Sequence, residues 1–154
     1  MGEIKLRRYD PRKDKEALES LVKDFDYRSI YPIKLEDFQK EVGQRVLDLK
    51  LRNSIVLAVE DPGDQLVGAG FFTIYRDYLG NFQCVVHDVV TRKENSFKKG
   101  IEEIILRELF KYIKNTLKID KVGLFVKKND TNYLSLLMKM QIKKSDLDFY
   151  EHTI

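Results

Sequence analysis

The spacing of apolar and polar positions changes several times along the chain, and each change predicts an element. Alternation over residues 3–9 predicts a strand, and apolar residues at helical spacing predict helices over about 10–25, begun by Asp10-Pro11, and about 35–49. Three apolar stretches follow at 54–60, 66–75 and 82–90, separated by short turn-forming segments. Short connections between consecutive strands predict an antiparallel meander.

The second half of the chain predicts a long helix over about 101–117, a short strand at 121–127 and a helix capped within 129–132. Alternation over residues 146–153 predicts a closing strand. The resulting order, β-α-α-β-β-β-α-β-α-β, predicts an α/β (α+β) fold. We expect one domain over residues 1–154, with a single mixed, mostly antiparallel sheet flanked by helices.

The stretch from Cys84 to Lys114 predicts an anion site. It reads as an apolar strand, a polar and basic loop that ends in Gly100, and an amphipathic helix. The first N–H groups of a helix lack partners within the helix, and the helix dipole adds positive potential there. Basic side chains surround this point: Arg92, Lys93, Lys98 and Lys99. The pattern favours a phosphate-bearing ligand.

Composition narrows the classes of protein and site. Among 154 residues, 34% are charged, yet the net charge is only +3, which does not by itself indicate a nucleic-acid-binding protein. Cys84 is the only cysteine, so an internal disulfide is excluded, and two histidines are too few for a histidine-built zinc site. We expect no metal, no membrane segment and a cytoplasmic location, because the apolar runs are too short to span a bilayer or to serve as a signal peptide.

Three stretches resemble the GCN5-related N-acetyltransferase (GNAT) superfamily. Residues 66–70, Leu-Val-Gly-Ala-Gly, are similar to the family's third strand. His87-Asp88-Val89-Val90 followed by Lys98-Lys99-Gly100-Ile101 resembles the fourth strand and the acyl-CoA loop, and Asn129 before a helix resembles the segment after the fifth strand. The resemblance, with the element order, implies a GNAT-like acyltransferase that moves an acetyl group from acetyl-CoA to an amine of a protein or small molecule by direct attack.

The resemblance also implies site residues. The acetyl-CoA positions are, along the fourth strand, Val89, Val90 and Thr91, and, in the loop and after the fifth strand, Phe97, Lys98, Lys99, Gly100, Ile101 and Asn129. His87 stands where family members often carry a glutamate, so it is the candidate general base. Leu136 or Leu137 replaces the family's helix tyrosine, and Tyr150 or Tyr133 is the candidate substitute that protonates the leaving thiolate.

Several departures keep alternatives open. Only Gly100 survives of the family's loop pattern, and Gln141-Ile142 stands in place of its Gly-Phe pair. Phosphate binding requires the Glu102 carboxylate to point outward. A catalytically degenerate GNAT-fold protein that binds acyl-CoA or a protein partner is therefore the alternative. His87 also fits a structural histidine and Cys84 a buried apolar residue. The sequence disfavours a nucleic-acid-associated role, because aromatic residues do not interleave its basic clusters. The sequence leaves open whether the protein forms a homodimer.

Overall fold

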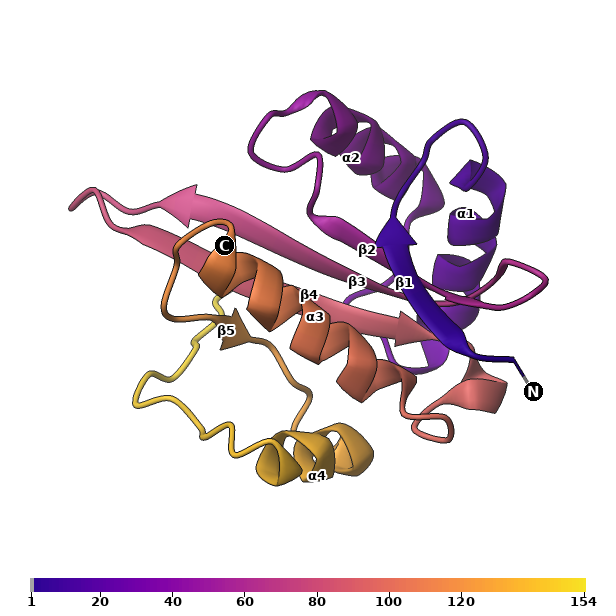
Figure 1. The fold of residues 1–154 in the computed structure, drawn as a ribbon. Coiled ribbons are helices and arrows are strands. Elements are labelled where there is room, and N and C mark those ends of the chain that lie inside the picture. Colours follow the sequence, from indigo (N-terminus) through magenta and orange to yellow (C-terminus); the bar gives the residue numbers. More distant parts are fainter. Residues whose placement is uncertain (1) are drawn as a thin grey trace.

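The computed structural model describes residues 2–154 and contains a five-stranded sheet in the order β1-β2-β3-β4-β5 (Figure 1). The strands are β1 Ile4–Arg8, β2 Ile55–Glu60, β3 Gln65–Arg76, β4 Phe82–Thr91 and β5 Gly123–Leu124. The helices are α1 Lys15–Asp24, α2 Leu35–Leu47, α3 Ile101–Asn115 and α4 Thr131–Lys139, with short 3₁₀ turns at Phe25–Tyr27 and Lys93–Asn95. Strands β1 to β4 pair antiparallel and β5 runs parallel to β4, which confirms the predicted fold class.

Helices cover the sheet on both faces. Helices α1 and α2 pack on one face and α3 and α4 on the other, with separate apolar cores between (Figure 1). Strand β2 contributes to both cores, because Ile55 and Leu57 face α1 while Val56 and Ala58 face α3. Burial on both faces explains why its sequence is a continuous apolar run rather than an alternation. Within residues 2–154, no helix combines the length and the apolar character needed to cross a membrane.

Two glycines of β3 let α3 approach the sheet closely. A Cβ atom built on Gly70 would lie 2.5 Å from Ile105 Cγ2 and 2.9 Å from Leu109 Cδ1. A Cβ atom on Gly68 would lie 2.8 Å from Ile101 Cγ2. Glycine within a strand often marks such a close approach of a neighbouring element. This contact fixes α3, and therefore its N-terminus, against the sheet.

Gly70→Ala is expected to destabilise the fold by about 1–3 kcal/mol, because the added methyl group overpacks the interface between α3 and β3. Gly43 in α2 is the matched control, since nothing lies within 4 Å of its Cβ position. Gly43→Ala is expected to stabilise the protein by about 0.5–1 kcal/mol through helix propensity. Urea denaturation measures both changes; an equal effect of the two substitutions would contradict the close packing at Gly70.

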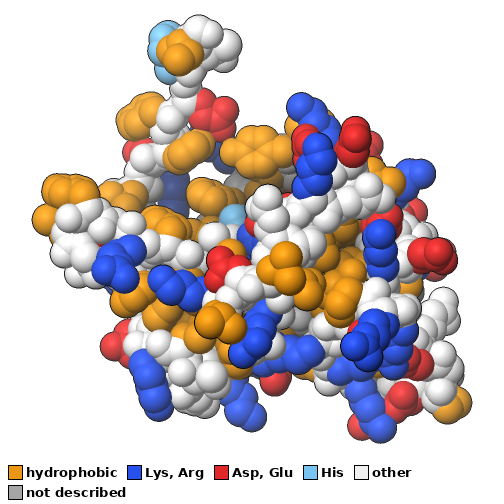
Figure 2. Space-filling view, turned by 90° about the horizontal axis from the view of Figure 1, so that it is seen from above, with side chains coloured by type: hydrophobic (Ala, Val, Ile, Leu, Met, Phe, Trp, Pro, Cys, Tyr) orange, Lys and Arg blue, Asp and Glu red, His pale blue; other side chains and the backbone are white. Residues whose placement is uncertain are grey.

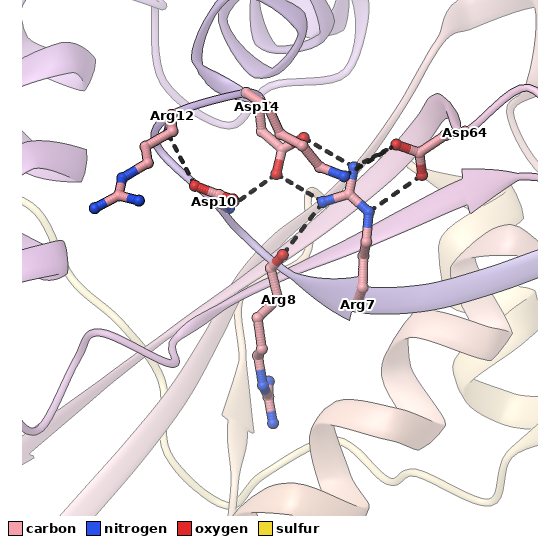
Figure 3. Close-up of polar contacts among 7 residues, drawn as sticks. Arg7, Arg8, Asp10, Arg12, Asp14 and Asp64 are labelled. Carbon is pink, nitrogen blue, oxygen red and sulfur yellow. Dashed lines mark hydrogen bonds and ion pairs between the residues drawn. The ribbon is translucent and has the colours of Figure 1, made fainter.

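Helix α1 begins later than the sequence predicts. Asp10 and Pro11 lie in a turn, and the helix starts at Lys15 with Asp14 before it. The Asp14 carboxylate is committed to the chain's own network, since it accepts hydrogen bonds from Arg7 Nη1 (2.6 Å) and Nη2 (2.8 Å) and from the Asp10 N–H (Figure 3). Burial acts to raise the pKa of Asp14, but the bonds from Arg7 and Asp10 outweigh it and lower the pKa. This network joins β1 to α1.

The last predicted strand does not form. Residues 146–153 alternate as a strand does, but the structure gives them no strand partner within residues 2–154. Strand β5 is also shorter than predicted, two residues in place of 121–127. Alternation reports a period of two and carries no information about the neighbouring strand that a ladder needs. The observed element order is therefore the predicted order without its final strand.

Candidate functional site

Strands β4 and β5 meet over a short distance and then separate. Their ladder consists of Val85 with Gly123 and Val86 with Leu124. Beyond this point β4 continues to Thr91, so its edge from residue 87 to 91 is not paired with β5. A bulge in the β3–β4 pairing between Gly70 and Phe72 falls at the same level. Bulges re-aim side chains and end pairing, and here the result is an opening in the sheet.

The N-terminus of α3 lies beside this opening and presents free backbone donors. Gly100 precedes the helix with a φ of 68°, a left-handed conformation that favours glycine. Within residues 2–154, the N–H groups from Lys99 to Glu103 have no hydrogen-bond acceptor, and the first helical bond is that from Ile104 to Gly100 O. These donors and the helix dipole make the predicted anion-binding geometry.

Glu102 turns inward, so the outward orientation that phosphate binding requires is not the one in this structure. The side chain is 1% exposed, and its Oε2 accepts hydrogen bonds from the Phe97 N–H (2.9 Å) and the Thr91 hydroxyl (3.0 Å). Phe97 itself has a φ of 58°, an uncommon conformation for a residue with a side chain, and the bond to Glu102 helps to hold it. The Glu102 carboxylate thus already accepts the hydrogen bond of one loop N–H group, that of Phe97, so this N–H is not free to bind an anion.

Arg28, from the segment between α1 and α2, ties this region together. Its Nε donates to Asp130 Oδ2 (2.9 Å), and its Nη1 lies 3.7 Å from Glu102 Oε2. The guanidinium also lies over the rings of Phe97 (4.7 Å) and Tyr133 (5.1 Å). Only 10% of the Arg28 side chain is exposed. We call Arg28, Glu102, Asp130 and Tyr133 the Arg28 cluster; it links the N-termini of α3 and α4 to the α1 side of the sheet.

Three buried polar atoms of this cluster have no hydrogen-bond partner within residues 2–154: Glu102 Oε1, the Tyr133 hydroxyl and Arg28 Nη1, which forms only the longer ion pair with Glu102. Such atoms are uncommon in folded proteins, and their convergence marks a place where a polar group of a ligand can be accommodated. Burial raises the pKa of Tyr133, so its hydroxyl keeps its proton at neutral pH. The Asp130 carboxylate meanwhile caps α4 by accepting from the Tyr133 N–H.

A pocket of about 400 Å³ opens above the cluster. Its walls come from the α1–α2 segment, the β4–α3 loop and the start of α4, and include Tyr27, Arg28, Lys93, Phe97, Lys127 and Asn129. Of the predicted ligand residues, Phe97 and Asn129 line it. Lys98 is exposed elsewhere on the loop, and Lys99 Nζ pairs with Glu60 (3.4 Å). The basic residues that line the pocket are Arg28, Lys93 and Lys127; of these, only Lys93 was among the basic residues that the sequence placed around the anion site.

The remaining predicted ligand residues lie in β4 and at the start of α3, beside the opening. The side chains of Val89 and Ile101 are buried in the α3 core and that of Val90 in the α1 core. The Thr91 side chain is buried, and the Tyr27 hydroxyl donates to the Thr91 carbonyl (2.9 Å). Of these residues, Val89, Val90 and Thr91 lie on the stretch of β4 that β5 does not pair, with their side chains buried.

His87 and Asp88 occupy adjacent positions of β4 with different surroundings. Arg45 Nη2 donates to Thr73 Oγ1 (2.6 Å), and Thr73 Oγ1 shares a hydrogen bond with His87 Nε2 (2.6 Å). Burial, and then the charge of Arg45, lower the pKa of His87. Burial raises the pKa of Asp88, and the nearby Arg28 charge offsets part of that increase. Asp88, which the sequence reasoning did not assign, lies on the stretch of β4 that β5 does not pair.

His87 is expected to make stability depend on pH in a defined window. Its pKa is lower in the folded state, so below about pH 6.5 the unfolded chain binds a proton that the folded chain does not, and stability falls as pH falls. The loss is at most about 1.4 kcal/mol per pH unit. Urea denaturation between about pH 7 and about pH 5 should show this loss in the wild type and a smaller one in His87→Gln. Identical pH profiles for the two proteins would contradict it.

Tyr150 is not brought to the opening. It lies in the C-terminal segment, 87% exposed, and makes no hydrogen bond within residues 2–154. Cys84 is buried, and burial raises the pKa of its thiol to about 11, so it is a poor nucleophile at neutral pH. Within the described residues, no group of three or more His, Cys, Asp or Glu side chains is arranged to hold a metal ion.

Sequence reasoning missed Arg28 and the inward position of Glu102. Arg28 follows two aromatic residues in a loop, which gives no periodic signal, and its partner Asp130 lies 102 positions away. The inward position of Glu102 did have a signal in the sequence. Glu102 lies four positions before Leu106, which is fully buried, and positions four apart share a helix face. This spacing favours an inward Glu102 carboxylate.

Solved structures of acetyltransferases share this architecture. A possible acetyltransferase from Clostridium difficile 630 aligns with a TM-score of 0.75 at 16% identity, over 98% of this chain and 97% of that one. A GNAT family acetyltransferase from Staphylococcus aureus aligns with a TM-score of 0.68 at 15% identity over both whole chains. The NatC complex bound to Gag peptide and CoA contains a chain that aligns with a TM-score of 0.70 at 13% identity, over 90% of this chain and 83% of that one. The chain has the GNAT fold.

No protein-family model and no curated protein matches the sequence. The GNAT fold is thus retained although the loop pattern is not. At the end of α4, Gln141 adopts a φ of 62°, a left-handed conformation at the position that corresponds to the family's glycine.

Proposed function

We propose that this GNAT-fold protein transfers an acetyl group from acetyl-CoA to an amine at the opening between β4 and β5. The observation that carries the proposal is the coincidence of three features at one place. The β4 edge from 87 to 91 is free, the unpaired N–H groups of α3 adjoin it, and a pocket with three basic side chains lies above. Together they suit an extended ligand with a diphosphate at one end and amide groups along its length.

The chain's own groups would hold acetyl-CoA in defined ways. The N–H groups from Lys99 to Glu103 would bind phosphate oxygens, and the Lys93 and Lys127 ammonium groups would add attraction. The backbone of Val89, Val90 and Thr91 would pair with amides of the ligand. Arg28 Nη1 and the Tyr133 hydroxyl are buried donors without a hydrogen-bond acceptor within residues 2–154, although Nη1 forms an ion pair with Glu102. Glu102 opposes phosphate binding, so its carboxylate must yield the Phe97 N–H on binding.

Acetyl-CoA supplies a thioester whose carbonyl carbon an amine attacks directly. In that reaction a C–N bond forms, the C–S bond breaks, and the ammonium proton of the acceptor goes to a base of the protein. His87 and Asp88 are the candidate bases. Asp88 is the first of the two to test, because His87 Nε2 is engaged by Thr73, whereas burial raises the pKa of the Asp88 carboxylate on the stretch of β4 that β5 does not pair.

Tyr133 is the proposed proton donor to the leaving thiolate. It belongs to the Arg28 cluster, its hydroxyl is unpartnered, and it keeps its proton at neutral pH. Expelling a bare thiolate at neutral pH costs only roughly 2 kcal/mol, because a thiol has a pKa near 8.5. Loss of the hydroxyl in Tyr133→Phe would therefore slow transfer rather than abolish it.

A second candidate function, acyl-CoA or partner binding without transfer, is favoured by one observation. The buried Glu102 carboxylate already satisfies the Phe97 N–H and the Thr91 hydroxyl, as a bound anion would. If Glu102 keeps these two hydrogen bonds when a ligand binds, the protein must hold that ligand through groups other than a diphosphate.

Calorimetry with acetyl-CoA, followed by acetylation assays on a panel of peptide N-termini, lysine peptides and small amines, tests the proposal. We expect a dissociation constant near micromolar, about −8 kcal/mol, and acetylation of at least one amine class. Absence of binding at millimolar acetyl-CoA would refute the proposal. Binding without acetylation of any amine would support the second candidate. If the protein is active, kcat is measured for Asp88→Asn and for His87→Gln. The variant with the lowered kcat identifies the base.

A further inference from the structure

The solvent face of α3 carries basic residues in one row. Arg107, Lys111 and Lys114 recur at intervals of four and three positions, which places them on one face of the helix, opposite its buried apolar stripe. All three residues are exposed, and together they span about 10 Å along the helix axis. Two further exposed lysines, Lys118 and Lys121, follow in the segment between α3 and β5. We call these five residues the basic row.

The positive charge of the chain is concentrated in the basic row. Residues 107–121 contain five basic and two acidic residues, a net charge of +3 that equals the net charge of the whole chain. Arg107 pairs with Glu103 at the surface, but within residues 2–154 the four lysines of the row form no ion pair. On the face over α1 and α2, which Figure 2 shows, basic and acidic side chains are instead interspersed. The basic row is therefore the surface that attracts an anionic partner.

Lys118 has a backbone conformation that favours glycine, with a φ of 59°. On either side of it, the Leu117 N–H donates to Tyr112 O (3.3 Å) and the Ile119 N–H to Ile113 O (3.1 Å), so the chain wraps over the end of α3. Helices commonly end in a left-handed residue, which is usually glycine because a Cβ atom is disfavoured there. A lysine at this position costs stability, and such a cost points to a role of its side chain outside the fold.

The surroundings of the basic row indicate which anionic partner it fits. No large apolar side chain between residues 83 and 124 is exposed, and the apolar face of α3 is buried against the sheet. Protein interfaces need an apolar core, and helices that lie on membranes need an apolar face. Single strands bind by stacking on aromatic rings, but the Tyr112 ring of α3 is covered by Arg8 at 4.2 Å. The phosphates of a duplex require only positive charges, so the sequence argument against single strands does not apply to them.

We propose that the basic row binds the phosphate backbone of a double-stranded nucleic acid. Its members on α3 are about 5–6 Å apart, close enough for several of them to contact phosphates of one duplex. Such contacts carry no information about the bases, so binding is independent of nucleotide sequence. The proposal does not depend on acetyl transfer.

Fluorescence anisotropy on the full chain, with labelled DNA and RNA duplexes of about 20 base pairs, tests the proposal. We expect a dissociation constant on the order of micromolar near 50 mM salt, and a slope of log affinity against log salt of about −4. The double variant Lys111→Glu with Lys114→Glu should bind at least about tenfold more weakly, with a slope smaller by about 2. The matched control is Lys34→Glu with Lys40→Glu, which makes the same change in net charge at exposed positions before and within α2 and should bind as wild type does.

Lys118→Gly separates binding from stability. Glycine relieves the left-handed backbone, so the melting temperature should rise by about 2–5 °C, while duplex binding should weaken several-fold. Unchanged duplex binding in this variant would contradict the proposal.

Three other results would overturn the proposal. These are a wild-type protein that binds neither duplex near 50 mM salt, a control variant that loses as much affinity as the Lys111 and Lys114 variant, and a single strand or polyglutamate that competes as well as the duplex at equal charge. Binding of either duplex supports the proposal, and the duplex that binds more tightly identifies the nucleic acid.

Discussion

Replacing Glu102 with glutamine is expected to tighten the binding of CoA by about tenfold to a hundredfold, or about 1.4–2.7 kcal/mol. The carboxylate is buried and lies beside the N–H groups that a diphosphate would use. Two unit charges of like sign about 5 Å apart repel by roughly 3 kcal/mol at an effective dielectric constant near 20. Glutamine keeps an acceptor for the Phe97 N–H and removes only the charge.

Glu103→Gln is the matched control for this prediction. Glu103 lies in the same first turn of α3, but its carboxylate pairs at the surface with Arg107 (2.9 Å) and Lys139 (2.8 Å). Calorimetry should therefore give wild-type affinity for Glu103→Gln and higher affinity for Glu102→Gln. Weaker or unchanged binding in Glu102→Gln would show that the carboxylate does not compete with the ligand.

The fold was largely predictable because its signals are local or periodic. The apolar run of β2, the glycines of β3 and the amphipathic stripe of α3 each report burial through spacing. The closing strand was predicted wrongly, because alternation over 146–153 specifies a strand-like segment without specifying a partner. The start of α1 was also displaced, since Asp14 rather than Asp10 precedes the helix.

The site was predictable only in part. Gly100 and the free N–H groups after it follow from a strand, a turn and a helix in sequence. The Arg28 cluster does not follow, because it joins residues from three distant segments whose proximity depends on how α4 packs. Of the loop lysines, Lys93 lines the pocket whereas Lys99 pairs with Glu60 on β2, and the pocket lysine Lys127 comes from a segment that the loop pattern did not point to. Side-chain direction in loops is set by tertiary partners that spacing cannot name.

Arg28→Ala is expected to cost about 3–5 kcal/mol of folding free energy, the range measured when one partner of a buried ion pair is removed. The substitution leaves Asp130 and Glu102 without their counter-charge and removes the cation that packs on Phe97 and Tyr133. Because Arg28 links the N-termini of α3 and α4 to the segment after α1, the loss should also loosen the walls of the pocket.

Urea denaturation of Arg28→Ala, Glu102→Gln and the double variant measures how this energy is shared. Since Glu102 without Arg28 is an unpaired buried charge, adding Glu102→Gln to Arg28→Ala should restore roughly 1–2 kcal/mol, a coupling typical of residues in one network. Arg107→Ala is the control, because Arg107 pairs with Glu103 at the surface, and surface pairs contribute less than about 1 kcal/mol. An Arg28→Ala protein no less stable than Arg107→Ala would mean that the Arg28 cluster does not hold the opening together, and additive single-variant effects would mean that Arg28 and Glu102 act independently.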